Sequence, residues 1–234
     1  MRAAAVQFKA TKGDLAGSLE RLAALTDEAA ADADLVVLPE MAATGYVFER
    51  RDEVEAVAEA ARGPTLAALG AVARAREAWI VCGFPERDGD HLYNSALVVA
   101  PDGELATVYR KTLLFEADEH WARPGDGAYT CLATPVGRVA VGICMDLNDP
   151  RFLLWLWRAR PDVLAFPTNW VDEGADVWPY WAARVRASGA VLVAANTYGR
   201  DGAWAFSGAS VILAGRRVLA AGPREGDAVV RADW

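Results

Sequence analysis

The sequence predicts an α/β protein in which helices pack outside mixed β-sheets. Short apolar runs of strand length recur along the 234 residues, and segments with a helical apolar period separate some of them. No linker of biased composition and no repeat of fixed period divides the chain. We therefore expect a single domain over residues 1–234.

The first half of the chain is expected to contain five strands and two helices. Asp14 is placed to cap a helix whose apolar stripe ends near Ala29. Gly63-Pro64 begins a second helix, with proline at its first position. Pro101-Asp-Gly103 predicts a hairpin turn between the last two strands. The expected strands lie at 3–8, 35–38, 79–84, 92–100 and 105–109.

The second half is expected to contain more strands than helices. One helix begins at Pro150 and another covers 176–188. The segments 42–49 and 112–128 follow neither period, so we expect loops there, and long loops in compact domains are often functional. The expected strands lie at 129–134, 138–143, 162–166, 191–195, 209–213, 218–221 and 228–231.

Charge and hydropathy narrow the classes of partner. The formal net charge is -8, and the sequence has no dense run of lysine and arginine. We therefore expect no nucleic-acid partner. No apolar run approaches the ~20 residues that span a bilayer, so no membrane partner is expected. The N-terminus lacks the apolar core and cleavage site of a signal peptide, which predicts a cytoplasmic protein.

The cysteine, histidine and lysine contents are also informative. Three widely separated cysteines without a CxxC pair, and only two histidines, argue against a disulfide framework and a metal centre. We expect no metal and no cofactor. Among 24 basic residues only Lys9, Lys12 and Lys111 are lysine. An interior lysine in so arginine-rich a chain suggests a need for a compact ammonium group.

Three reactive side chains follow apolar strands. Glu40 follows the strand at 35–38, Lys111 follows the one at 105–109, and Cys144 follows the one at 138–143. Each alone also fits an ordinary structural role, either a solvated loop charge or a buried thiol. Because ligands of α/β sheets gather at the carboxyl ends of strands, we expect the three side chains to meet at one site.

The motifs around these residues resemble a known family. In this order and spacing they are similar to the three signature motifs of the nitrilase superfamily of carbon–nitrogen hydrolases. The resemblance extends through essentially the whole chain. It implies a four-layer α-β-β-α sandwich and cofactor-free hydrolysis of a non-peptide C–N bond. The motifs are Leu38-Pro-Glu40-Met, Tyr109-Arg-Lys111-Thr-Leu-Leu-Phe and Gly142-Ile-Cys144-Met-Asp.

The resemblance also implies catalytic roles. Cys144 would attack the substrate carbon and form a thioester intermediate, while Glu40 would act as general base. Lys111 would stabilise the oxyanion, with the backbone N–H of Met145 as its partner, since fixed donors aimed at developing charge stabilise a transition state. The expected substrate is a small carboxamide, which would release ammonia.

Members of this family also use a second acidic residue after the lysine. Glu116, Asp118 and Glu119 compete for this position. Glu119 is preferred because it lies eight residues after Lys111, and Asp118 remains open.

The substrate itself is less closely predicted. Tyr46, Asn169 and Trp170 are expected to line the pocket, and Asn94 is a weaker candidate. A short resemblance around Cys144 points to the protein N-terminal amidases. The alternatives are therefore N-terminal Asn/Gln deamidation, N-carbamoyl hydrolysis, nitrile hydrolysis and a catalytically silent scaffold. We also expect a homodimer or higher homo-oligomer, with Trp155 and Trp157 serving core or dimer packing.

Overall fold

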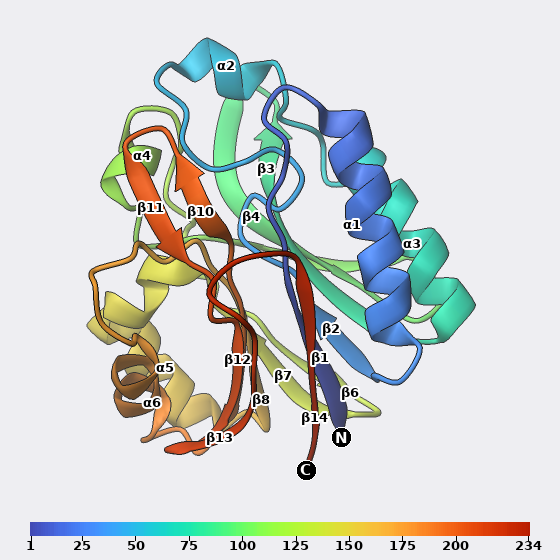
Figure 1. Cartoon of the computed structure of the whole chain (residues 1–234), viewed down its shortest axis with the longest axis vertical. Helices are drawn as coiled ribbons and strands as arrows, with labels where there is room; N and C mark the ends of the chain where they lie inside the picture. The colour runs from blue at the N-terminus through green and yellow to red at the C-terminus, as the bar shows by residue number, and fades with distance from the viewer.

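The computed structural model describes all residues 1–234 and has four layers. Two six-stranded sheets face each other, with strand orders β14-β1-β2-β3-β4-β5 and β13-β12-β9-β8-β7-β6 (Figure 1). Helices α1 (Leu15–Ala30) and α3 (Pro64–Arg76) cover the first sheet. Helices α5 (Pro150–Ala159) and α6 (Trp178–Val185) cover the second. The expected α-β-β-α sandwich is confirmed.

Both sheets are mixed, as predicted. In the first sheet β1, β2 and β3 are parallel, and in the second β7, β8 and β9 are parallel. The first sheet contains β1 (Arg2–Gln7), β2 (Leu35–Val37), β3 (Trp79–Asp88), β4 (His91–Val99), β5 (Leu105–Arg110) and β14 (Ala228–Asp233). The second contains β6 (Cys131–Thr134), β7 (Gly137–Val141), β8 (Val163–Pro167), β9 (Val191–Ala195), β12 (Val211–Ala214) and β13 (Arg217–Ala221).

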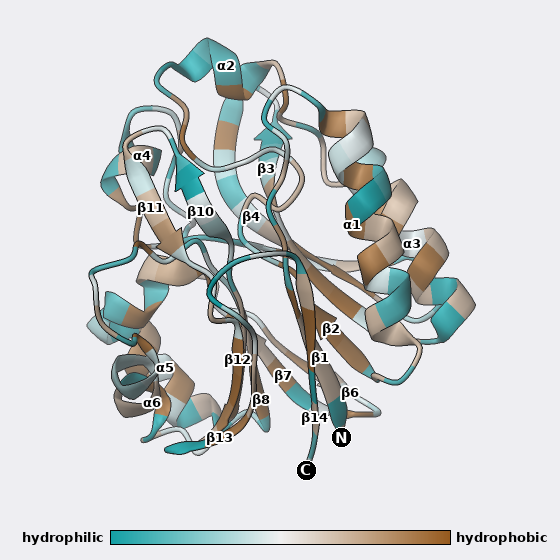
Figure 2. Ribbon diagram, in the orientation of Figure 1, coloured by the Kyte–Doolittle hydropathy of each residue, from teal (hydrophilic) through white to brown (hydrophobic).

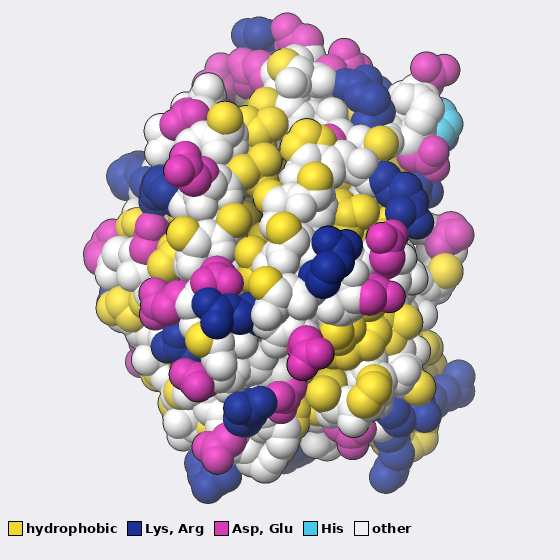
Figure 3. Space-filling view, turned by 90° about the vertical axis from the view of Figure 1, so that its right-hand side faces the viewer, with side chains coloured by type: hydrophobic (Ala, Val, Ile, Leu, Met, Phe, Trp, Pro, Cys, Tyr) yellow, Lys and Arg dark blue, Asp and Glu magenta, His cyan; other side chains and the backbone are white.

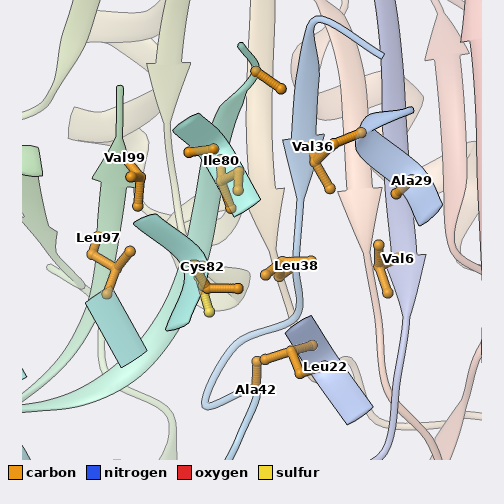
Figure 4. Packing of buried hydrophobic residues seen from close by; sticks show 14 of the residues in the cluster. Val6, Leu22, Ala29, Val36, Leu38, Ala42, Ile80, Cys82, Leu97 and Val99 are labelled. Atoms are coloured by element: carbon orange, nitrogen blue, oxygen red, sulfur yellow. The ribbon is translucent and has the colours of Figure 1, made fainter. Parts of the chain in front are cut away.

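Strand alternation divides the apolar side chains among three packed layers. In β2, Leu35 and Val37 enter the core between the sheets, whereas Val36 packs under α1 and α3. Figure 4 shows Val36 of β2 and Ile80 of β3 in the same cluster as Leu22 of α1. Strands buried on both faces need apolar residues at nearly every position, and the central strands are accordingly brown in Figure 2.

Several short elements were not predicted. The segment 112–128, expected to be a loop, contains α4 (Glu116–Glu119), and α2 (Arg51–Glu55) follows the loop at 42–49. A 3-10 turn, η1 (Cys144–Asn148), follows β7 directly. Strands β10 (Tyr198–Asp201) and β11 (Trp204–Ser207) form a separate hairpin, which lies beside α4 in Figure 1. Elements this short do not contain a full apolar period, so sequence pattern does not detect them.

The surface carries charges of both signs. Figure 3 views the molecule from the side of α1 and α3, where basic and acidic side chains are interspersed among apolar patches. None of the helices combines the length and apolar character that crossing a bilayer requires.

Candidate active site

Glu40, Lys111 and Asp118 form a buried ion cluster. Glu40 follows β2, Lys111 follows β5, and Asp118 lies on α4. Lys111 Nζ donates to Glu40 Oε1 at 2.7 Å and to Asp118 Oδ2 at 2.6 Å, and all three side chains are fully buried. Asn94 Nδ2, on β4, donates to Glu40 Oε1 at 2.7 Å and to Asp118 Oδ1 at 3.1 Å. Two carboxylates therefore share one ammonium group, and Asn94 links the two carboxylates.

The preference for Glu119 in this cluster is corrected by the structure. Glu119 is exposed, whereas its neighbour Asp118 is completely buried against Lys111. Asp118 Oδ2 also accepts from the backbone N–H of Phe115 at 3.1 Å, which closes the first turn of α4. This N-terminal cap holds the Asp118 side chain toward the cluster, because the capping carboxylate must turn back over the start of its helix.

The segment after β8 fixes Glu40 from the other side. The Asn169 backbone N–H donates to Glu40 Oε2 at 2.9 Å, and its Nδ2 donates to the Glu40 carbonyl at 2.8 Å. Gly83 packs against the Glu40 backbone so closely that an added Cβ would lie 2.5 Å from Glu40 Cα. Both oxygens of the carboxylate thus have defined hydrogen-bond partners.

Cys144 occupies a strained turn at the end of β7. Its φ is 43°, in the left-handed region that residues with a Cβ rarely adopt, and it is 5% exposed. Burial raises the pKa of the Cys144 thiol, the charge of Glu40 raises it further, and Lys111 lowers it. The thiol is therefore neutral at rest and needs a base to become a nucleophile.

The two charged neighbours are suited to complementary roles. Burial raises the pKa of Glu40 and the charge of Asp118 adds to this effect, while Lys111 opposes it. Burial lowers the pKa of Lys111, but Asp118 and Glu40 outweigh burial, and the net pKa is raised. Glu40 is thus a stronger base than an ordinary carboxylate, beside a permanent cation.

Asp146 connects the turn of Cys144 to the segment of Lys111. It is completely buried and lies two residues after the thiol. Its carboxylate accepts from Tyr109 Oη (2.8 Å), Thr112 N (3.0 Å), Thr112 Oγ1 (2.8 Å), Leu113 N (3.1 Å) and Ile143 N (2.9 Å). Sequence pattern alone assigns Asp146 no role, although its place in the motif Gly142-Ile-Cys144-Met-Asp is a signal for it.

Of the other expected pocket residues, Tyr46 lies at this centre, whereas Trp170 and Met145 do not line the cavity beside Glu40. The hydroxyl of buried Tyr46 has no hydrogen-bond partner, and Lys111 Nζ lies 5.7 Å from the Tyr46 ring centroid. Trp170 is half-buried against Trp181, with ring centroids 5.6 Å apart, and Met145 packs against the core between the sheets. Thr168 Oγ1 is also buried without a partner. Such unpaired buried groups are suited to bonding a bound molecule.

A cavity of about 420 Å³ adjoins the cluster, and Glu40, Tyr46 and Asn169 contribute to its wall. The chain contains no group of three or more His, Cys, Asp or Glu side chains arranged to hold a metal ion.

Sequence comparison places the chain among known hydrolases. The family model described as carbon-nitrogen hydrolase matches residues 2–233. A hydrolase in the pqqF 5' region of Pseudomonas protegens is 33% identical over 229 residues, which cover 95% of this chain and 79% of that protein. A nitrilase of Pyrococcus abyssi is 42% identical over 140 residues, 59% of this chain and 53% of that protein.

A protein N-terminal amidase of Schizosaccharomyces pombe is 31% identical over 163 residues, 65% of this chain and 57% of that protein. The chain thus spans little more than half the length of two of these relatives. An amidase from a Nesterenkonia species has a similar structure, with a TM-score of 0.85 and 22% identity over 100% of this chain and 90% of that one. In a mutant of that amidase, the acetamide moiety of fluoroacetamide is attached covalently to the active site cysteine.

Proposed function

Because the chain belongs to the carbon–nitrogen hydrolase family, we propose that it is an amidase that hydrolyses the C–N bond of a small carboxamide through a thioester on Cys144. The observation that carries the proposal is the shared hydrogen bonding of one buried ammonium, Lys111, by Glu40 and Asp118. This arrangement supplies a base and a fixed cation at the strand end next to the thiol. These are the groups that acyl transfer requires.

The first half-reaction uses Glu40 as base. Its carboxylate takes the proton of Cys144 Sγ as the sulfur attacks the amide carbon, and the carbonyl oxygen becomes an oxyanion. Lys111 and the N–H of Met145 stabilise this charge. The C–N bond then breaks as Glu40 returns the proton to the leaving nitrogen, so ammonia departs and a thioester remains.

The second half-reaction regenerates the thiol. Glu40 takes a proton from water as the water oxygen attacks the thioester carbon. The second tetrahedral intermediate collapses with cleavage of the C–S bond, and the proton returns to sulfur. The carboxylic acid leaves, so one water is consumed for each ammonia and acid formed. Asp118 keeps Lys111 in place through both steps.

Ammonia release tests this proposal directly. Purified protein would be incubated with butyramide, an N-carbamoyl amino acid, an Asn-peptide and a nitrile, with Cys144→Ala as the matched control. Ammonia from butyramide in the wild type alone, with an acyl adduct on Cys144 in mass spectrometry, supports the proposal. Absence of ammonia from every compound would overturn it.

Deamidation of N-terminal Asn or Gln is the second candidate. The 31% identity to the protein N-terminal amidase favours it. Turnover of the Asn-peptide well above that of butyramide would select this alternative over a small amide.

We also propose that the protein forms a homodimer through α5. Leu154 and Trp157 on this helix are 47% and 46% exposed, whereas Phe152 and Leu156 are buried against the second sheet. Large apolar side chains on the outer face of a helix commonly mark a contact surface. A cytoplasmic location stays a prediction from sequence.

A further inference from the structure

The cavity beside Glu40 is lined by an unusual concentration of positive charge. It lies between the segment after β1, the loop after β2 and the β10–β11 hairpin. Besides Glu40, only one acidic side chain lines it, Asp201. The whole chain has a net charge of -8, so the excess of cationic side chains in this cavity is opposite in sign to the charge of the whole protein. The four cationic side chains are Lys9, Lys12, Arg21 and Arg200.

Two of these four cations already have carboxylate partners. Lys12 Nζ lies 3.7 Å from Asp201 Oδ1, and Arg21 donates to Asp227 Oδ2 at 2.7 Å. Lys9 and Arg200 form no ion pair within 4.0 Å. Half-buried Lys9 has therefore lost part of its hydration without forming an ion pair within 4.0 Å.

The hairpin is shaped to receive the ammonium group of Lys9. Gly199 has a φ of 73°, and an added Cβ there would lie 2.9 Å from Lys9 Nζ. Glu225 Oε2 lies 3.8 Å from the same Cβ position, but Glu225 does not line the cavity. Because Gly199 has no side chain, the Lys9 ammonium group can lie close to the backbone of Gly199, next to Arg200 in the chain.

Lysine usage singles out the same region. The chain has three lysines, of which Lys111 belongs to the ion cluster and the other two, Lys9 and Lys12, line this cavity. A compact ammonium fits the confined space at Gly199, where a planar guanidinium would need more room.

We propose that this cavity binds the carboxylate group of a small organic anion through Lys9 and Arg200. About 420 Å³ accommodates a small metabolite-sized molecule, and Phe8 and Phe206 provide apolar wall for its carbon chain. Since Glu40 and Tyr46 also line this cavity, the carboxylate belongs either to the amide substrate itself or to a free acid. The first source rests on the proposed amidase function.

Paired substrates test the first source. Succinamate and butyramide share the amide and differ by a carboxylate in place of a methyl group. The wild type is expected to favour succinamate in kcat/KM, and the variant Lys9→Met/Arg200→Gln is expected to lower the succinamate-to-butyramide ratio roughly 10- to 100-fold, as for loss of charge-assisted hydrogen bonds. The ratio should also fall with ionic strength.

Two control variants accompany this measurement. Arg217→Gln removes one charge from exposed β13, away from the cavity, and should keep the wild-type ratio. Lys9→Arg keeps the charge but places a bulkier guanidinium at Gly199, so its ratio should lie between those of the wild type and Lys9→Met. Circular dichroism and thermal unfolding would establish that each variant is folded.

Binding of a free acid tests the second source without any turnover. Calorimetry with glutarate on the Cys144→Ala protein is expected to show binding that Lys9→Met/Arg200→Gln abolishes. A ratio that depends on Lys9 and Arg200 assigns the carboxylate to the substrate, and glutarate binding alone assigns it to a free acid. If Lys9→Met/Arg200→Gln leaves the succinamate-to-butyramide ratio unchanged and the protein does not bind glutarate, the inference is overturned. If no amide is hydrolysed, the amidase proposal fails, but calorimetry with glutarate still tests whether the cavity binds a carboxylate.

Discussion

Asp118 Oδ2 lies 2.6 Å from Lys111 Nζ, and neither side chain is accessible to solvent. Glu40 binds the same ammonium group at 2.7 Å. Burial raises the pKa of Glu40, Lys111 opposes this rise, and the charge of the second carboxylate, Asp118, adds to it. The ion pair between Asp118 and Lys111 therefore does two things: it fixes the cation and strengthens the base.

Replacing Asp118 by Asn is expected to lower kcat/KM about 100-fold, the size typical for losing one electrostatic group in a buried site. The adjacent Glu119→Gln change is the matched control, and because Glu119 is exposed we expect activity within about twofold of wild type. Steady-state ammonia release measures both. A larger loss in Glu119→Gln than in Asp118→Asn would contradict the assignment.

Replacing Glu40 by Gln is expected to abolish turnover while preserving the fold. Glutamine cannot accept the thiol proton, yet it avoids the desolvation that makes the buried charge unfavourable. We expect an unchanged or raised Tm by calorimetry. A fall of more than about 4 °C, equivalent to roughly 1 kcal/mol or more in a chain of this size, would indicate instead that Glu40 stabilises the fold.

The acid limb of kcat/KM is expected to report the raised pKa of Glu40. The base works only when ionised, so activity should fall as pH drops through that pKa, at a higher pH than for an ordinary glutamate near about 4.3. The charge of Asp118 is one cause of the rise, so in Asp118→Asn the residual activity should extend to lower pH. An acid limb that does not move in this variant would argue against Glu40 as the base.

Replacing Asp146 by Asn is expected to reduce kcat more than KM and to destabilise the fold by about 2–3 kcal/mol, since buried donors lose their acceptor. Asp146 is a positioning residue, because it holds the Cys144 turn against the Lys111 segment. Asp149→Asn is the control: this residue caps α5 through the N–H of Arg151, so it should leave kcat nearly unchanged. Urea unfolding and steady-state kinetics separate the two effects.

Replacing Trp157 by Glu is expected to convert the proposed dimer to a monomer at micromolar concentration. The change introduces a charge into an apolar contact on α5 without disturbing the buried face of that helix. Light scattering after gel filtration gives the mass. Val218→Glu, at an equally exposed apolar site on β13, is the control and should not alter it. A monomeric wild type would contradict the proposal.

Most of the sandwich could be predicted because its elements carry local signals. The apolar run of β2 and the Gly63-Pro64 start of α3 depend on neighbouring residues alone, and the structure has both elements close to the expected bounds. The hairpin β10–β11 could not be predicted in this way, since it is stabilised by packing against distant residues such as Tyr46, whose ring lies 6.1 Å from that of Phe206.

The sequence by itself determined that Glu40, Lys111 and Cys144 each stand at the end of a strand, because a strand and its end are encoded by contiguous residues. Only the tertiary structure decided between Asp118 and Glu119. Adjacent helical residues point about 100° apart, so the inward one depends on how α4 docks. The hydrogen bonds of Asp146 to the segment after Lys111 join parts of the chain that are far apart in sequence, and so does the cationic cavity. No local sequence pattern specifies such contacts.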